Sequence, residues 1–328
     1  MRVLVTGGAG YIGSHAAREL ARCGHQVRVF DNLVNGHAFL CRDFEFMQGD
    51  LRDAKSLGTA VAGMDAVMHF GALASVAESV ENPRRYFQNN VDGTLQLLDA
   101  VLDAGIPTFI FSSTAAVYGN PEVVPIREDS PRVPINPYGV SKLLIENALE
   151  AYSRAYGLRF IAFRYFNAAG ADASGEIGEV HEPETHLIPI LLLAAVGVRS
   201  EVNIYGEDYP TPDGTCIRDY IHVTDLVSAH VRGLEYLTAG GESTSMNLGT
   251  EKGFSVREVI AATEKVTGIT LRKRIVSRRP GDPAVLLADP SRARQLLQWT
   301  PTRSLEVMIE SAWKWLQNYR ERPEIRKA

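Results

Sequence analysis

The sequence predicts an α/β protein with a doubly wound parallel sheet and a smaller, interleaved C-terminal part. Strand and helix signals alternate through the first half of the chain, as they do where helices connect parallel strands. A glycine cluster separates the first strand from the first helix. Beyond residue 166 the alternation loosens, and glycine and proline become dense at 170–183 and 206–214, as is typical of loops that cover a ligand.

The elements of the first half have separate signals. Ile12, Ala16 and Leu20 share one face of the first helix. Asn82 is a candidate helix cap, and Pro83 follows it in the first turn. We expect this helix to continue to about residue 104 and to end at Gly105. Another helix is expected over 137–156. Strands are expected at 3–5, 26–30, 44–47, 66–70, 108–113 and 159–165.

The chain divides into two units without a clean linker. Residues 1–166 are expected to form a nucleotide-binding domain of the Rossmann type, whose main sheet is completed by about 219–250. Residues 167–328 are expected to be mainly a substrate-binding domain, with 272–288 in the smaller part.

Composition excludes several classes of function. The chain has 328 residues, 45% hydrophobic and 22% charged, with a net charge of −5, which argues against nucleic acid or an acidic membrane as a partner. The longest apolar run, 187–198, contains a proline and is too short to span a bilayer. Met1 leads directly into a strand, so no secretory signal is expected. The 3 widely spaced cysteines fit a reducing cytoplasm.

Two histidines partly match a metalloprotease motif. His181 and His186 are five positions apart rather than four, and Pro183 interrupts any helix between them. We therefore expect no metal at this place.

The glycine cluster indicates a dinucleotide. Gly7, Gly10 and Gly13 provide a tight turn, close backbone approach to phosphate, and close packing of the helix on the sheet. Asp31 ends the second strand, where a carboxylate accepts hydrogen bonds from ribose hydroxyls and repels a 2′-phosphate. The sequence therefore favours NAD over NADP. Asp50, after the third strand, is a candidate contact to the adenine edge.

Tyr138 and Lys142 lie one turn apart on a single helix face, downstream of the Ser112-Ser113-Thr114 strand end. Using a tyrosine oxygen as a base near neutrality requires its pKa to fall from about 10 toward 7, which corresponds to about 4 kcal/mol. A nearby ammonium supplies part of this by favouring the phenolate, and a cationic nicotinamide would supply more.

Together these motifs resemble the extended short-chain dehydrogenase/reductase family, and within it the UDP-glucose 4-epimerases. The resemblance covers nearly the whole chain, and the last two segments are the most specific for epimerases of nucleotide sugars. The segments that carry it are Thr6–Gly13, His69-Phe70, Asn89–Thr94, Phe111–Gly119, Tyr138–Lys142, Arg164–Asn167, Leu187–Pro189, Asp213–Val223 and Arg279–Asp282.

The resemblance implies reversible inversion at C4 of UDP-glucose and UDP-galactose, with N-acetyl forms left open, through a 4-keto sugar and with NAD bound. Tyr138 would be the acid/base, Lys142 its electrostatic and ribose-binding partner, and Thr114 the hydroxyl that orients the sugar. The implied NAD contacts are Gly7, Gly10, Tyr11, Ile12, Gly13, Asp31, Asn32, Asp50, Leu51, Phe70, Asn90, Ser112, Tyr138, Lys142 and Phe166. The implied UDP-sugar contacts are Thr114, Tyr138, Asn167, Leu187, Asn203, Tyr205, Arg218, Tyr220, Arg279, Asp282 and Leu286.

Three positions depart from the family pattern. Ala74 stands where many relatives direct a lysine toward the cofactor phosphates, and His186 stands where some have an asparagine that contacts substrate. Leu286 aligns with a gatekeeper that is bulky in hexose-specific relatives and small in those that accept N-acetyl sugars.

Two alternative functions fit these residues less well. A nucleotide-sugar 4,6-dehydratase needs an acid and a base after the threonine, where this chain has Ala115 and Ala116. A non-catalytic NAD-binding protein has no need of Tyr138, Lys142 and Thr114 together. The resemblance also implies a homodimer through a helix-pair interface, to which some of Tyr86, Val91, Leu95 and Leu98 would contribute unless they belong to the core.

Overall fold

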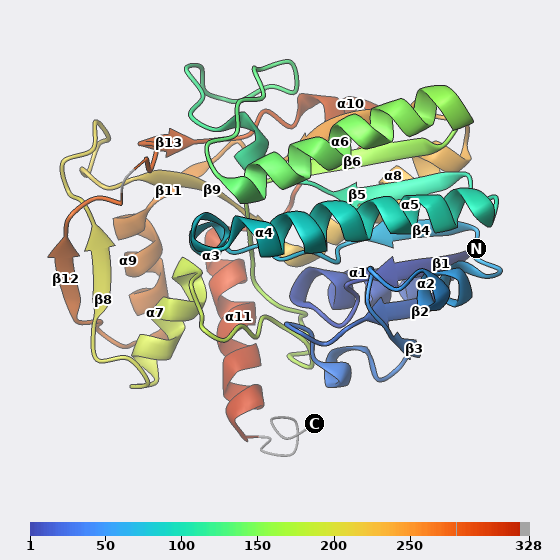
Figure 1. Cartoon of the computed structure of the whole chain (residues 1–328). Helices are drawn as coiled ribbons and strands as arrows, with labels where there is room; N and C mark the ends of the chain where they lie inside the picture. Colours follow the sequence, from blue (N-terminus) through green and yellow to red (C-terminus); the bar gives the residue numbers. More distant parts are fainter. Residues whose placement is uncertain (280, 322–328) are drawn as a thin grey trace.

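The computed structural model describes residues 1–279 and 281–321. Its centre is a sheet of seven parallel strands with helices on both faces (Figure 1), which confirms the predicted doubly wound architecture. The strand order reverses between β1 and β4, the place where doubly wound sheets bind their ligands. Along the sheet the strands are β3 (Glu45–Gln48), β2 (Gln26–Asp31), β1 (Arg2–Thr6), β4 (Ala66–His69), β5 (Thr108–Ser112), β6 (Arg159–Tyr165) and β10 (Thr244–Leu248).

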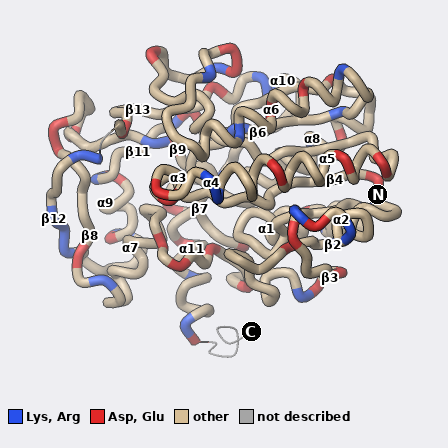
Figure 2. The backbone as a smooth tube through the Cα atoms, viewed as in Figure 1, with Lys and Arg blue, Asp and Glu red and all other residues tan. Residues whose placement is uncertain are grey.

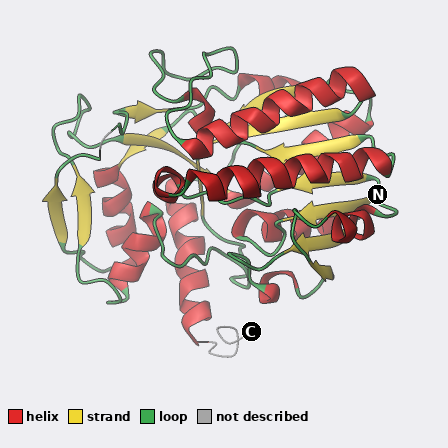
Figure 3. Cartoon of the chain, viewed as in Figure 1, coloured by secondary structure: helices red, strands yellow, loops and turns green. Residues whose placement is uncertain are grey.

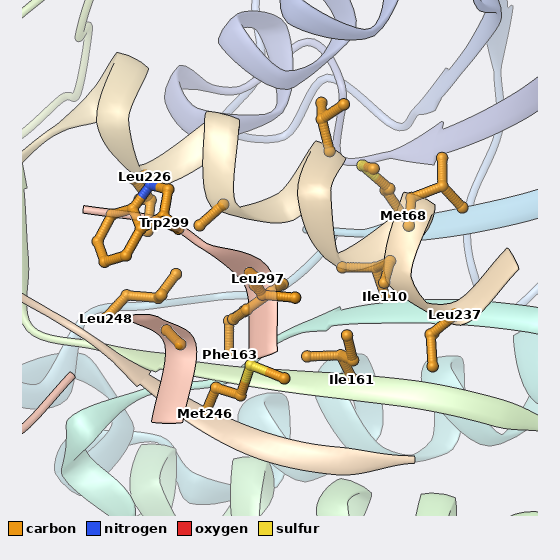
Figure 4. Close-up of a cluster of buried hydrophobic side chains, with 14 of the residues drawn as sticks. Met68, Ile110, Ile161, Phe163, Leu226, Leu237, Met246, Leu248, Leu297 and Trp299 are labelled. Carbon is orange, nitrogen blue, oxygen red and sulfur yellow. The ribbon is translucent and has the colours of Figure 1, made fainter. Parts of the chain in front are cut away.

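Two hydrophobic layers hold the helices on this sheet. The first lies under α2 (Ala54–Val61), α5 (Gly93–Asp103) and α6 (Pro137–Tyr156). The second lies under α1 (Tyr11–Arg22), α8 (Val223–Thr238) and α10 (Ser291–Leu297). In this second layer Phe163, Leu248 and Trp299 pack together between the sheet and the helices (Figure 4).

The helix that Asn82 caps is less regular than predicted. Asn82 Oδ1 accepts a hydrogen bond from Arg85 N, and Pro83 occupies the first turn. The helix runs as α4 (Pro83–Tyr86), a π-helical segment η2 (Phe87–Asp92) and α5, and it ends before Gly105 as expected. A shorter helix, α3 (Val76–Glu81), precedes it.

The smaller part contains two further sheets (Figure 3). In one, β9 (Ile217–His222) pairs with β7 (Asn167–Ala169), β11 (Gly253–Ser255) and β13 (Val285–Leu286); in the other, β8 (Val202–Tyr205) pairs with β12 (Lys273–Val276). Helices α7 (Leu187–Ala195), α9 (Val256–Thr267) and α11 (Leu305–Glu321) surround them. The segment 219–250 was expected to return to the main sheet. Within it, α8 covers that sheet and β10 joins it. The strand β9 does not, because its backbone pairs with strands of the smaller part.

Backbone hydrogen bonds connect the loop after β5 to the segment after β13, in addition to the places where the chain itself passes between the two parts. Ile126 N donates to Leu287 O at 2.8 Å, and Asp289 N donates to Ile126 O at 2.8 Å. A 3₁₀ helix, η3 (Ala115–Tyr118), begins this connecting loop at the end of β5, and another, η1 (Ala38–Cys41), follows β2. Charges of both signs are interspersed over both parts (Figure 2).

Candidate active site

The turn between β1 and α1 has the shape of a phosphate cradle. Gly7 has φ of +71°, and a Cβ there would lie 2.5 Å from Gly71 N; a Cβ at Gly13 would lie 2.1 Å from Gly7 O. A Cβ at Gly10 would meet one atom within 4 Å among the described residues, Gly7 O at 3.3 Å. Gly10 is also the N-cap of α1 and provides no side-chain cap. The free backbone N–H groups of this helix end are therefore available to an anion, as a dinucleotide requires.

Polar side chains gather at the carboxyl ends of β2 and β3. Asp31 is buried, and its carboxylate accepts hydrogen bonds from Leu33 N at 2.8 Å and Ala9 N at 3.1 Å. Asn32 Nδ2 donates to Asp50 Oδ2 at 3.0 Å, and Arg52 pairs with Asp50 and lowers the pKa of that carboxyl. The Asp31 carboxylate at the end of β2 disfavours a 2′-phosphate. The residues present therefore fit NAD.

Other predicted cofactor residues lie around this edge. The Tyr11 hydroxyl donates to Gly170 O at 2.6 Å and so ties α1 to the smaller part, while Ile12 packs on the core. Leu51 is buried, and its Cδ1 would lie 3.1 Å from a Cβ at Gly71. The Phe70 ring lies 5.1 Å from the His230 ring.

The π-helical segment directs Asn90 into the protein. Asn90 is fully buried: its Oδ1 accepts from Leu73 N at 2.9 Å, and its Nδ2 donates to Leu73 O at 3.0 Å and Ser141 Oγ at 3.2 Å. The bonds fix the loop after β4 against α6, the helix that carries Tyr138 and Lys142.

Helix α6 positions the candidate acid/base. It begins as predicted, with Asn136 Oδ1 accepting a hydrogen bond from Gly139 N at 2.9 Å and a proline in the first turn. Lys142 Nζ donates to Ser112 O at 2.7 Å and lies 6.0 Å from the centroid of the Tyr138 ring. Tyr138, Lys142 and Thr114 are thus brought together at the end of β5.

The protein alone does not lower the pKa of Tyr138. Burial raises the pKa of Tyr138, and a hydrogen bond with Thr114 only opposes this rise. Burial also lowers the pKa of Lys142 to about 7, although the Glu146 charge acts the other way. Both shifts have one cause, the cost of placing a charge in a buried site. A cation bound beside Tyr138 would oppose this rise by favouring the phenolate.

A buried ion-pair network that sequence reasoning missed supports this site. The Glu146 carboxylate is fully buried and pairs with Arg164, with 2.6 Å between Glu146 Oε2 and Arg164 Nη2. Ser113 Oγ donates to Glu146 Oε1 at 2.5 Å, and Arg164 Nη1 donates to Tyr118 Oη at 2.8 Å. Glu146 follows Lys142 by one helical turn, a spacing visible in the sequence. Its partner on β6 is not visible there.

Apart from Thr114 and Tyr138, the candidate nucleotide-sugar contacts lie on the smaller part. A cavity of about 450 Å³ is lined by Asn120, Arg278, Arg279, Gly281, Asp282 and Pro283. Arg279 and Asp282 were predicted, whereas Asn120 and Arg278 were missed because no motif distinguishes them. Arg218 forms an ion pair with Asp282, and the Arg279 guanidinium lies 4.0 Å from the centroid of the Tyr205 ring.

The remaining predicted substrate residues lie outside the lining of this cavity, on several elements. Asn167 Nδ2 donates to Asp219 O at 2.9 Å, Leu187 begins α7, and Asn203 lies two positions before Tyr205 on β8. Leu286 pairs with Arg218 in the register of β13 and β9, and it packs with Phe166 against a small cluster around Val117. Tyr220 differs from the others, because it belongs to the hydrophobic core of the smaller part.

Within the residues described, no helix has both the length and the apolar character needed to cross a membrane.

Comparisons with known proteins agree with this geometry. The family model of the NAD dependent epimerase/dehydratase family matches residues 3–249. The chain is 51% identical over 318 residues to a UDP-glucose 4-epimerase of Halalkalibacterium halodurans, covering 96% of this chain and 95% of that protein. It is similar to the crystal structure of UDP-glucose-4-epimerase from Stenotrophomonas maltophila with bound NAD and formylated UDP-arabinopyranose, with a TM-score of 0.95, 43% identity, and coverage of 98% and 99% of the two chains. A UDP-Glc/GlcNAc 4-epimerase from Campylobacter jejuni matches with a TM-score of 0.85, 42% identity, and coverage of 97% and 99%.

Proposed function

The chain belongs to the NAD dependent epimerase/dehydratase family, and from that premise we propose that it is a UDP-hexose 4-epimerase that interconverts UDP-glucose and UDP-galactose. The observation that carries the proposal is the meeting of Tyr138, Lys142 and Thr114 at the end of β5, beside a glycine cradle that fits NAD.

The chemistry requires a reversible oxidation at C4. Bound NAD would supply this redox chemistry by reversible hydride exchange with C4, and the glycine turn around Gly10 and the carboxylate of Asp31 would hold it. Tyr138 takes the proton of the C4 hydroxyl and gives it back, and Thr114, which bonds to Tyr138, orients that hydroxyl. Lys142 favours the phenolate through its charge, and its bond to Ser112 holds it on the strand.

The smaller part would hold the nucleotide while the sugar turns. Arg218 and Arg279 offer guanidinium groups that match phosphate oxygens, and Asp282 orients Arg218. Inversion at C4 needs a firmly held nucleotide and a loosely held sugar, because the 4-keto sugar must present its other face without release of the nucleotide. Leu286, which packs with Phe166, is intermediate in size between the gatekeepers that the resemblance associates with hexoses and with N-acetyl sugars. We therefore propose UDP-glucose and UDP-galactose as substrates and leave the N-acetyl forms to the test below.

The dehydratase alternative is disfavoured by the residues after Thr114. Ala115 and Ala116 begin the helix η3 and offer methyl groups, which transfer no protons. The non-catalytic alternative is disfavoured by the meeting of Tyr138, Lys142 and Thr114, which a protein without catalysis does not need.

We also propose a cytoplasmic homodimer. The cysteines Cys23, Cys41 and Cys216 are free thiols, which fits a reducing compartment.

Tyr86 and Leu98, two of the residues considered for a subunit contact, are core residues of the subunit. The exposed apolar side chains Val80 on α3 (63%) and Leu144 on α6 (44%) are better candidates for the helix-pair interface. Light scattering of purified protein checks the dimer.

The decisive experiment supplies the enzyme with NAD and separate UDP-sugars and identifies the products by NMR and mass spectrometry. We expect interconversion of UDP-glucose and UDP-galactose without net consumption of NAD. A 4-keto-6-deoxy product, or NADH formed in proportion to the sugar converted, would overturn the proposal.

A further inference from the structure

The loop that leads into α7 brings four metal-ligating side chains together. Glu179, His181, Glu184 and His186 each offer one ligand atom, and these atoms all lie within 4.8 Å of one another. The expectation that His181 and His186 hold no metal assumed that they would meet on a helix. They meet on an irregular loop instead, where the five-position spacing and Pro183 are no obstacle.

The distances between these atoms lie on both sides of those in a tetrahedral metal site. Glu179 Oε1 lies 3.0 Å from His181 Nδ1 and 2.8 Å from His186 Nδ1, and Glu184 Oε2 lies 3.9 Å from His181 Nδ1. Ligands bound at about 2.0–2.2 Å around a tetrahedral zinc are separated by roughly 3.3 Å. The four ligand atoms are separated by distances of up to 4.8 Å, so an ion would draw some side-chain ends together by up to about 1.5 Å. It would also replace the direct contacts that His181 and His186 make with Glu179.

The backbone around the cluster is already fixed, which a preformed site requires. Trp315 Nε1 on α11 donates to Glu179 O at 3.0 Å, and Arg199 Nη2 donates to Glu184 O at 3.2 Å. Glu184 Oε1 also accepts from His186 N at 2.7 Å, which leaves its Oε2 as a ligand atom. The loop therefore does not need to fold around an incoming ion.

Exposure and charge also fit a cation. The side chains of Glu179 and Glu184 are 8% and 7% exposed, whereas those of His181 and His186 are 32% and 54% exposed. An ion can thus enter past the imidazole rings and reach two carboxylates that are withdrawn from water. Two carboxylates and two neutral imidazoles around a divalent ion give a site without net charge.

We propose that Glu179, His181, Glu184 and His186 bind a divalent transition metal, zinc by preference, as a structural site. Imidazole and carboxylate donors in a four-coordinate arrangement suit zinc and its neighbours in the first transition series. All four ligand positions are filled by protein, so the ion would have a structural rather than a catalytic role. It would hold the loop between Gly170, which bonds to Tyr11, and Leu187 at the start of α7.

The test uses the full-length chain, free of any affinity tag, stripped with EDTA and then dialysed. Zinc binding is measured by elemental analysis after gel filtration, and Co²⁺ serves as a spectroscopic probe because four-coordinate cobalt absorbs strongly in the visible range. We expect one metal per chain, a tetrahedral cobalt spectrum that zinc abolishes, and a higher melting temperature in the presence of zinc.

His181→Gln and Glu184→Gln should each weaken zinc binding at least tenfold and remove the cobalt spectrum. The matched control is Glu182→Gln, an exposed carboxylate of the same loop outside the cluster, which should bind like the parent. Melting temperatures in EDTA show that each variant is folded. The proposal is overturned if the parent binds less than one equivalent, if its cobalt spectrum is octahedral, or if His181→Gln and Glu182→Gln bind alike.

Discussion

Lys142 Nζ donates a hydrogen bond of 2.7 Å to the carbonyl oxygen of Ser112, the last residue of β5. This bond holds the ammonium group at a fixed place beside Tyr138, and the proposed role of the lysine depends on it. Lys142→Met should therefore lower kcat by about 10²–10³, the usual loss for one preorganised donor in an active site. Steady-state kinetics with UDP-galactose check this, with circular dichroism as the control for folding. An unchanged kcat would show that the charge is not used.

Tyr138→Phe removes the hydroxyl that exchanges a proton with the substrate. We expect kcat to fall by roughly 10²–10⁴, the range for loss of an acid/base group, while NAD binding measured by calorimetry is retained. Tyr152→Phe is the matched control, because Tyr152 lies on the same helix but bonds to Asp99 away from the site. Equal activities of the two variants would contradict the assignment.

Gly10 and Gly13 should respond differently to an added methyl group. In Gly13→Ala the Cβ would lie 2.1 Å from Gly7 O, so the turn must distort, and we expect a loss of about 1–3 kcal/mol in the free energy of unfolding. In Gly10→Ala the nearest atom lies at 3.3 Å, so the fold should persist while the methyl group obstructs phosphate. Urea unfolding and NAD titration separate the two effects. Normal NAD affinity in Gly10→Ala would contradict the proposed cradle.

Glu146→Gln leaves the Arg164 guanidinium buried without its counter-charge. The expected cost is about 3–5 kcal/mol in the free energy of unfolding, as for other broken buried pairs. Glu150→Gln is the control: its side chain is 39% exposed and pairs with Arg132, and such surface pairs are worth about 0–1 kcal/mol. Similar losses in the two variants would show that the buried network is not important for stability.

Stability should fall in mild acid because four histidines are held neutral. Burial lowers the pKa of His15, His222 and His230 to about 4 and that of His69 to about 3. An unfolded histidine has a pKa of about 6.5, so below that pH the unfolded state binds more protons than the folded state. Stability that is complete above about pH 6.5 is therefore lost as pH falls toward 4, by up to about 1.4 kcal/mol per pH unit for each histidine.

Urea unfolding between about pH 7.5 and 5 measures this slope. His69→Asn removes one of the four titrating groups and can keep hydrogen bonds to Thr6 or Thr94, so its slope should be shallower. A free energy of unfolding that does not change over this range would contradict the prediction.

Local signals predicted most of the main sheet, because capping and hydrophobic spacing act over a few residues. Helix α6 begins and ends where Asn136, Pro137 and the left-handed Gly157 require. The π-helical turn that directs Asn90 inward was not predictable, because one extra residue in a turn leaves no mark in the apolar pattern. The partners of β9 were not predictable either, since strand pairing is decided by segments far away in the chain.

The candidate site was also predictable only where a local motif marks the residues. Motifs identified Tyr138, Lys142 and the glycine turn, whereas Asn120 and Glu146 become meaningful only when distant segments meet. The cluster around Glu179 lies within one loop and depends on the irregular backbone of that loop. The burial that raises the pKa of Tyr138 and lowers that of Lys142 is likewise set by the packing of distant segments and has no local signal in the sequence.

The position of β10 beside β6 has a consequence for synthesis of the protein. A nascent chain that has emerged from the ribosome as far as Tyr165 leaves β6 without its neighbour, because Thr244–Leu248 is made much later. Until then the apolar strand offers an open hydrogen-bonding edge to other chains. The risk of misassembly should therefore be greatest in this interval of translation, which gives molecular chaperones their natural point of action.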